Sequence, residues 1–169
     1  MENTMASFDA AFDSGLRYLE LDVAISKDGV VFVGHCHERL HEDCKHTPTQ
    51  PLIRDHTFDE LQLASPTVVS TLEKVLRKFK HRMAFQIELK HETDYRLGRL
   101  CNMALSDARC WQRALQPGRL VEGVLAVVER VGPPSANLTI SSFEGPRPRN
   151  WLQVDLSRGV RPALKLVGG

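Results

Sequence analysis

The stretch YLELDVAI, residues 18–25, most restricts what this chain can fold into. Its two leucines, its valine and its isoleucine lie at every second position, so in an extended strand they share one face. Glu20 and Asp22 then share the opposite face, about 7 Å apart along the backbone. The pattern predicts a β-strand that packs one face against a core and presents two carboxylates on the other.

A second stretch, MAFQIELK at residues 83–90, repeats the arrangement. Glu88 and Lys90 lie two apart, and Ile87 and Leu89 fall on the other face. If both polar faces line the lumen of a barrel, enclosed carboxylates repel one another and lose their hydration. A divalent cation relieves both effects, and hard oxygen ligands suit Mg²⁺ or Ca²⁺. A cation and a lysine together are a sensible receptor for a phosphodiester, because they stabilise charge on its non-bridging oxygens.

Periodicity alone leaves an alternative open. Strands that alternate apolar and polar residues are common at the solvated face or edge of a sheet. On that interpretation Glu20 and Asp22 are two acids in water, with no cation between them. Glu88 and Lys90 at the same spacing favour the enclosed site, and the spacing of the residues does not decide between the two.

The order of the expected elements indicates the fold class. Strands that alternate with helices are typical of parallel pairing through right-handed crossovers, so we expect an α/β fold, either a barrel or an open sheet. We expect strands at 18–25, 30–34, 83–90, 138–143 and 163–167. Helices are expected at 4–15, 57–63, 71–79, 94–114, 117–131 and 151–157.

Composition excludes several classes of function. The 169 residues suffice for one domain, and the formal net charge of +1 gives no general attraction to nucleic acid or an anionic membrane. No apolar run approaches the ~20 residues that span a bilayer, and the acidic N-terminus does not resemble a signal peptide. The default expectation is therefore a cytoplasmic protein with free thiols.

A series of short motifs runs through the chain: ENT at 2–4, SF at 7–8, ELDV at 20–23, KDG at 27–29, His35, FDEL at 58–61, TLEKVL at 71–76, IELK at 87–90 and SSF at 141–143. In their order and spacing these motifs resemble the glycerophosphodiester phosphodiesterases. The resemblance covers nearly the whole chain, and the run from ELDV through Asp-Gly to His35 is fairly specific.

The resemblance implies a TIM barrel that cleaves glycerophosphodiesters to an alcohol and glycerol 3-phosphate, in lipid and glycerol metabolism. It assigns one divalent cation, Mg²⁺ or Ca²⁺, to Glu20, Asp22 and Glu88, a phosphate contact to Lys90, and acid/base catalysis to His35. A histidine suits that role because its ordinary pKa lies near neutrality. In the implied reaction a glycerol hydroxyl of the substrate attacks phosphorus while two imidazoles move the protons.

The chain departs from the family pattern in three places. Met1 stands where the family has the proline of Pro-Glu-Asn-Thr, and an upstream His-Arg-Gly motif precedes that proline in the family. By the family pattern, about three of the eight barrel strands would lie beyond Gly169. We therefore expect residues 1–169 to be a partial domain that lacks the first strand and the last strands of the barrel, with uncovered edges that favour self-association. Cys36 replaces the usual aspartate after His35, which makes His37 a competitor for the catalytic role.

The sequence also leaves room for other sites and functions. Cysteines and histidines between Cys36 and His46 would permit a zinc site, although their spacing fits no standard finger. No Gly-x-Ser-x-Gly elbow or glycine-rich nucleotide loop is present. Two further functions stay open: a phospholipase that acts on an intact lipid headgroup, and a non-catalytic relative that binds phosphate esters or a protein partner.

Overall fold

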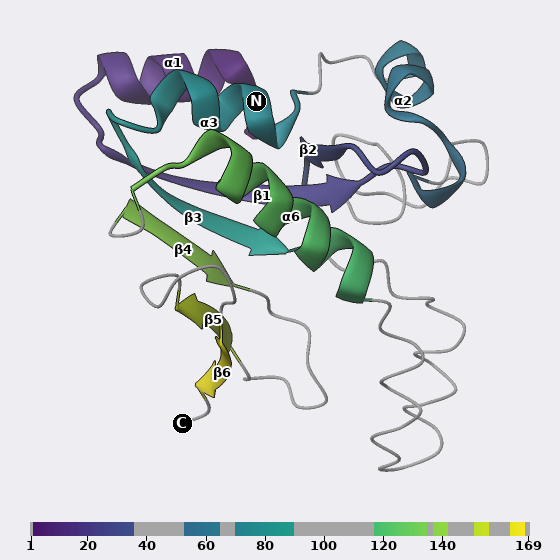
Figure 1. Cartoon of the computed structure of the whole chain (residues 1–169). Helices are drawn as coiled ribbons and strands as arrows, with labels where there is room; N and C mark the ends of the chain where they lie inside the picture. Colours follow the sequence, from purple (N-terminus) through teal and green to yellow (C-terminus); the bar gives the residue numbers. More distant parts are fainter. Residues whose placement is uncertain are drawn as a thin grey trace, which may run out of the picture.

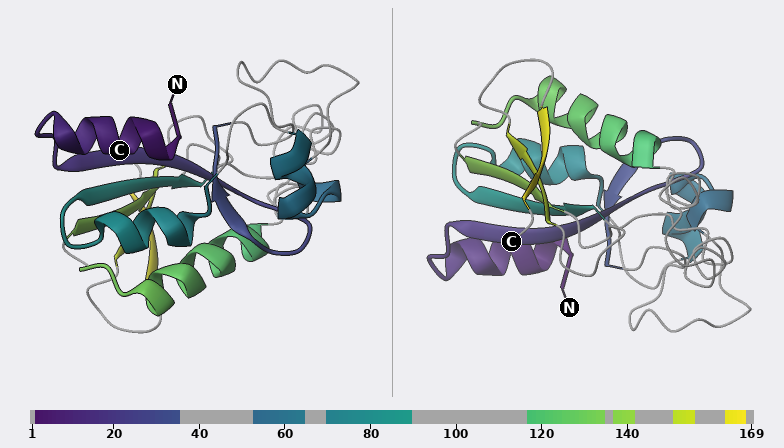
Figure 2. Two further views of the ribbon diagram at one scale, coloured as in Figure 1. Left: turned by 90° about the horizontal axis from the view of Figure 1, so that it is seen from above. Right: turned by 90° about the horizontal axis from the view of Figure 1, so that it is seen from below.

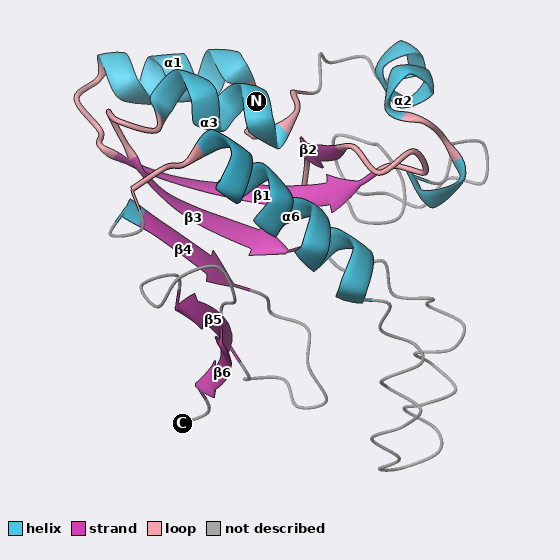
Figure 3. Ribbon diagram, viewed as in Figure 1, coloured by secondary structure: helices cyan, strands magenta, loops and turns pink. Residues whose placement is uncertain are grey.

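The computed structural model describes residues 2–35, 53–64, 70–89, 117–134, 137–141, 151–155 and 163–167. Their elements, in chain order, are α1 (Met5–Asp13), β1 (Tyr18–Ile25), β2 (Val31–Val33), a 3-10 turn (Ile53–Asp55), α2 (Phe58–Ala64), α3 (Leu72–Phe79), β3 (Ala84–Leu89), α6 (Pro117–Val131), β4 (Leu138–Ser141), β5 (Trp151–Asp155) and β6 (Ala163–Val167) (Figures 1 and 3). Within these ranges no helix is long and apolar enough to cross a membrane.

A four-stranded sheet in the order β2-β1-β3-β4 forms the centre of the molecule. β1, β3 and β4 run parallel, and β2 returns antiparallel beside the second half of β1 (Figure 1). The register sets Asp22 opposite Glu88, and Glu88 in turn opposite Ser141. The α/β fold with parallel strands that the sequence predicts is thus confirmed, and the strands form part of a barrel.

Most of the expected elements are present in the structure. The expected helices at 4–15, 57–63, 71–79 and 117–131 correspond to α1, α2, α3 and α6, and the expected strands correspond to β1, β2, β3, β4 and β6. The helix expected at 94–114 lies outside the described residues.

One expected helix, at 151–157, is wrong. Residues 151–155 form strand β5, which pairs antiparallel with β6. A short run such as WLQVD does not distinguish helix from strand by its pattern, and here the pairing with β6 decides. The last strand is therefore an arm of a hairpin rather than a further parallel strand.

Three helices cover one face of the sheet. Leu19, Leu21 and Val23 of β1 belong to one buried cluster that also takes in Phe8 of α1 and Phe79 of α3. Figure 2 shows α1, α3 and α6 arranged around the outer side of the strands. Because the leucine and valine face of β1 is buried under these helices, the acidic positions of the same strand point to the opposite face.

Local sequence signals explain where these helices begin and end. The side chain of Thr4 accepts a hydrogen bond from the amide of Ser7 at 3.1 Å and caps α1. Thr71 caps α3 in the same way, accepting from the amide of Lys74 at 3.2 Å. Each cap satisfies a backbone donor that has no partner within the helix. Gly15, with φ of +94°, follows α1 in a conformation that glycine adopts without strain.

α6 approaches the sheet closely at Gly123. A methyl group built on this glycine would lie 2.8 Å from Cγ2 of Val31 and 3.2 Å from Cδ1 of Ile25. Real side-chain contacts are longer than the first of these distances. The lack of a side chain at this position therefore lets the helix pack directly on β1 and β2.

The outer surface of the helix layer carries an ionic cluster. Glu73 of α3 accepts hydrogen bonds from Arg130 of α6 at 2.6 Å and from Arg77 at 2.8 Å. These two guanidinium groups, Arg130 first, hold the pKa of the Glu73 carboxyl below its usual value. The cluster therefore ties α3 to α6 most strongly when Glu73 is ionised.

Candidate metal centre

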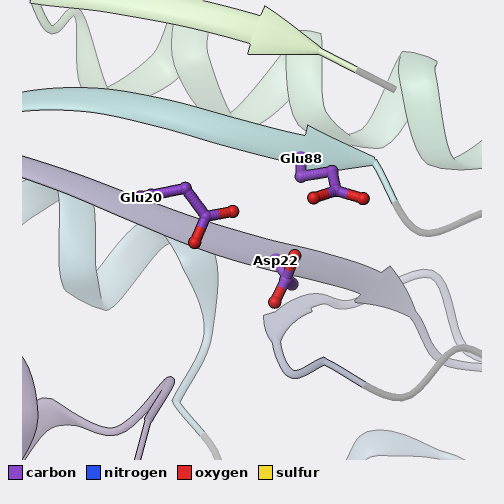
Figure 4. Close-up of side chains that lie close together, drawn as sticks. All are labelled: Glu20, Asp22 and Glu88. Carbon is purple, nitrogen blue, oxygen red and sulfur yellow. The ribbon is translucent and has the colours of Figure 1, made fainter. Parts of the chain in front are cut away.

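Three carboxylates gather on the polar face of the sheet. Glu20 and Asp22 come from β1, and Glu88 comes from the neighbouring strand β3 (Figure 4). One oxygen from each lies within 4.8 Å of the others. The gathering follows from the backbone, because Asp22 and Glu88 are register partners and Glu20 lies one same-face step before Asp22.

The three side chains differ in their exposure. Asp22 is 4% exposed and Glu88 is 6% exposed, whereas Glu20 faces solvent. β3 pairs with β1 from Tyr18 to Val23, and β2 pairs with it from Val23 to Ile25. The interpretation of the two β1 acids as solvated is therefore wrong for Asp22, whereas Glu20 does face solvent, and the site has two enclosed carboxylates and one at its rim.

The donor set fits a hard divalent cation. Ligands on opposite sides of Ca²⁺ lie about 4.6–5.2 Å apart, and on opposite sides of Mg²⁺ about 4.0–4.2 Å apart. Oxygens that lie within 4.8 Å of one another are close enough to share one ion of either kind. Carboxylate oxygen is the ligand type that both ions prefer.

A β-hairpin brings His35 back to the level of the carboxylates. β2 runs antiparallel to β1, and the amide of Gly34 donates to the carbonyl of Asp22 at 2.9 Å. His35 follows directly, half exposed, with its Nδ1 atom 3.8 Å from a carboxylate oxygen of Glu2. The hairpin therefore places a histidine beside the strand that supplies two of the three acids.

The turn of this hairpin is held by Asp28. Its carboxylate accepts hydrogen bonds from the hydroxyl of Ser26 and from the amide of Phe58 at the start of α2. The Ser26 hydroxyl is the main reason that the pKa of Asp28 lies below its usual value. Gly29 completes the turn with φ of +85°. The Lys-Asp-Gly motif thus fixes the hairpin and joins it to α2.

The glycerophosphoryl diester phosphodiesterase family model matches residues 1–122 of the chain. The chain belongs to this family. The match includes the strands β1 and β3, so all three gathered carboxylates lie within it.

Individual relatives agree with the family match. A glycerophosphodiester phosphodiesterase of Bacillus altitudinis is 32% identical over 99 residues, which make up 53% of this chain and 39% of that protein. The crystal structure of the glycerophosphodiester phosphodiesterase of Thermotoga maritima superposes with a TM-score of 0.59 at 25% identity, over 85% of this chain and 49% of that one. The chain thus spans between two fifths and one half of these family members.

A third relative was solved with a product bound. The phosphodiesterase of Oleispira antarctica, in complex with sn-glycerol-3-phosphate, has a TM-score of 0.54 at 22% identity, over 85% of this chain and 52% of that one. At this identity the likeness shows a shared fold.

The sequence predicts the grouping of the three carboxylates and a role for His35, and it assigns no role to several polar residues nearby. Tyr18 and Gln86 lie two residues before Glu20 and Glu88 on β1 and β3, and therefore on the same face. The hydroxyl of Tyr18 donates to the side-chain oxygen of Gln86 at 2.6 Å. The amide of Gln86 lies 3.5 Å from the hydroxyl of Ser141 on β4. Period-two alternation places these side chains on the polar face, and that is the signal that would have found them.

Two more neighbours lie in the Glu-Asn-Thr motif before α1. Glu2 lies beside His35, and Asn3 bonds to Asp22. These contacts join residues 33 and 19 positions apart, so no local pattern predicts them.

Several expected site residues fall outside the described residues. They are Lys90, the competing His37, and the cysteines and histidines considered for zinc between Cys36 and His46. The roles expected of them stay predictions.

Proposed function

We propose that this chain forms part of a glycerophosphodiester phosphodiesterase, a metal-dependent phosphoric diester hydrolase that releases an alcohol and sn-glycerol 3-phosphate. The observation that carries the proposal is the gathering of Glu20, Asp22 and Glu88 on adjacent strands of a family fold. The product bound to the Oleispira antarctica phosphodiesterase supports the substrate class.

In this proposal the three carboxylates hold one cation, Mg²⁺ or Ca²⁺, at the polar face of the sheet. When bound, the cation supplies positive charge to the non-bridging oxygens of the phosphodiester, where negative charge grows during the reaction. Lys90, the next residue in the sequence after β3, is the proposed phosphate contact. Two enclosed carboxylates and one at the rim leave the solvent side of the site for the substrate.

In this proposal His35 either accepts the proton of the attacking glycerol hydroxyl or donates a proton to the oxygen of the departing alcohol. A glycerol hydroxyl of the substrate forms a bond to phosphorus and gives up its proton, and the bond to the headgroup alcohol breaks as that oxygen gains one. Water then opens the resulting cyclic ester to glycerol 3-phosphate. An imidazole suits either transfer because it both accepts and donates protons near neutral pH. The Nδ1 atom of the ring lies 3.8 Å from a carboxylate oxygen of Glu2.

Cation binding is the first test. We expect the purified chain to bind one Mn²⁺, a paramagnetic substitute for Mg²⁺, as measured by loss of the free-ion signal in electron paramagnetic resonance. Glu88→Gln should weaken binding at least about tenfold, because affinity for hard cations follows the charge of the ligands. Glu122→Gln makes the same change at an exposed position of α6 and should leave binding unchanged. Equal binding by the chain and by Glu88→Gln would contradict the assignment of the site.

Turnover is the second test. Glycerophosphocholine is incubated with the chain and Mg²⁺ or Ca²⁺, and glycerol 3-phosphate is measured. Glu20→Ala and Glu88→Gln should each lower its release about 100-fold or more, since a cation supplies several kcal/mol of transition-state stabilisation. A folded chain that binds Mn²⁺ and releases no product would instead favour a phosphate-ester binding function, and release from intact phospholipid alone would favour a phospholipase.

We also propose that the chain associates with itself. Within the described residues, the first half of β1 has a strand neighbour on one side only, which is β3, and Leu16 just before β1 and Tyr18 at its start are 57% and 52% exposed. A strand with a neighbour on one side only, beside exposed apolar side chains, can pair with a strand of another copy. Light scattering after size-exclusion chromatography should give a mass above the 19.0 kDa monomer that rises with concentration. A monomer at all concentrations would refute the association.

A further inference from the structure

The structure holds an unusual contact just before the first helix. The side-chain amide of Asn3 donates to Oδ2 of Asp22 at 2.9 Å, and its oxygen accepts from the backbone amide of the same Asp22 at 3.2 Å. Both hydrogen bonds therefore end on one residue. Because they join the main chain of Asp22 to its own carboxylate, they fix the side-chain torsion between the two.

The backbone of Asn3 is adapted to this contact. Its φ of +56° makes it the only residue other than glycine with a positive φ among the described residues. Such a conformation is unfavourable for most side chains and several-fold less so for asparagine. Strained backbone of this kind persists where the surrounding structure holds it in place, often at functional sites.

The surroundings of Asn3 do hold it in place. Thr4, the next residue, caps α1 and forms a reciprocal capping box with Ser7. α1 is anchored in turn, since Phe8 is 4% exposed and belongs to the core cluster under the sheet. A continuous path of packed and hydrogen-bonded groups thus runs from the core through α1 to Asn3 and on to Asp22.

From this geometry we propose that Asn3 is a positioning residue that holds the Asp22 carboxylate in its cation-binding orientation, which rests on the proposed metal site. Groups behind a metal ligand restrict its orientation before the ion arrives, and their loss commonly weakens binding about tenfold to 100-fold. Asp22 is a suitable target because it is 4% exposed, and an enclosed carboxylate that rotates must break the bonds that hold it.

The test compares two substitutions in the same turn. Asn3→Gly keeps the positive φ without strain and removes both hydrogen bonds to Asp22. Thr4→Ala removes the cap of α1 and leaves Asn3 in place, so it loosens the turn without touching Asp22. Mn²⁺ affinity is measured by electron paramagnetic resonance, and folding by circular dichroism and thermal unfolding.

We expect Asn3→Gly to weaken Mn²⁺ binding about tenfold. Thr4→Ala should lower the melting temperature and keep the affinity within about twofold of the parent chain. In an Asp22→Ala background, Asn3→Gly should cause no further loss, because no carboxylate remains to be held. Unchanged affinity in Asn3→Gly, or an equal loss in Thr4→Ala, would overturn the positioning role. A parent chain that binds no Mn²⁺ would overturn the metal site itself and the positioning role with it.

A second measurement, made without metal, reports the side-chain conformation of Asp22 directly and so does not depend on cation affinity. Three-bond couplings from the backbone nitrogen and carbonyl carbon of Asp22 to its Cγ report whether the side chain keeps one rotamer. They should indicate a single rotamer in the parent chain and averaging in Asn3→Gly. Asn3→Asp keeps the shape of the side chain and sets a second carboxylate against Oδ2 of Asp22, so averaging is expected there too. Couplings that stay at parent values in both variants would refute the proposal.

Discussion

The two faces of the central sheet are built from alternate residues of the same strands and follow opposite rules. On the outer face, Ile87 of β3 is fully buried within one apolar cluster under three helices. On the inner face, the next residue, Glu88, is 6% exposed and gathers with two other carboxylates. Two consecutive residues of β3 therefore belong to different environments, one to the apolar core and the other to the group of carboxylates.

This difference separates stability from chemistry in the molecule. Removing side-chain volume from the outer face lowers the free energy of unfolding, because a cavity remains in close-packed surroundings. The inner face concentrates like charge, which does not stabilise the fold, and it does so where two adjacent strands meet. Enclosed like charges are the mark of a functional site rather than of a core.

The largest effect that would test this contrast is expected from neighbouring substitutions on β3. Ile87→Ala should destabilise the chain by about 2–5 kcal/mol, through lost burial and a new cavity. Gln86→Ala, one residue earlier on the other face, should cost about 1 kcal/mol or less, because it loses the hydrogen bond from Tyr18 at a partly exposed position. Urea unfolding measures both, and equal losses would remove the distinction between the faces.

A smaller effect is expected where α6 meets the outer face. Gly123→Ala gains about 1 kcal/mol of helix propensity, and it forces a methyl group to 2.8 Å from Val31. Overpacking costs about 1–3 kcal/mol, so we expect a net loss of up to about 2 kcal/mol by urea unfolding. In a Val31→Ala background the same substitution should be neutral or stabilising. A loss that persists there would show that the clash with Val31 is not the cause.

The smallest effect is expected at the surface of the helix layer. Glu73→Gln should cost at most about 1 kcal/mol near pH 7, because exposed ion pairs contribute little. The pKa of Glu73 is lower in the folded chain than its ordinary 4.5. Its contribution is therefore present above about pH 4.5 and is lost as pH falls through the lower, folded value.

Thermal unfolding checks this pH dependence. The difference in melting temperature between the parent chain and Glu73→Gln should shrink from pH 7 to pH 3. A difference that grows on acidification would contradict the sign of the pKa shift.

Sequence reasoning succeeded where a local period carries the information. Period-two alternation gave the faces of β1 and β3, and with them the grouping of Glu20, Asp22 and Glu88. It failed at 151–155, where a short apolar run suits either helix or strand and pairing with β6 decides. It also gave no role to Asn3, because the contact with Asp22 depends on a positive φ and a tertiary turn that no pattern reveals.

The place of Glu2 and Asn3 has a practical consequence for anyone who produces this protein. Both residues touch the site, one at His35 and one at Asp22. An affinity tag or fusion partner joined ahead of Glu2 would therefore begin beside the proposed metal site. Such a tag should be removed before cation binding or turnover is measured.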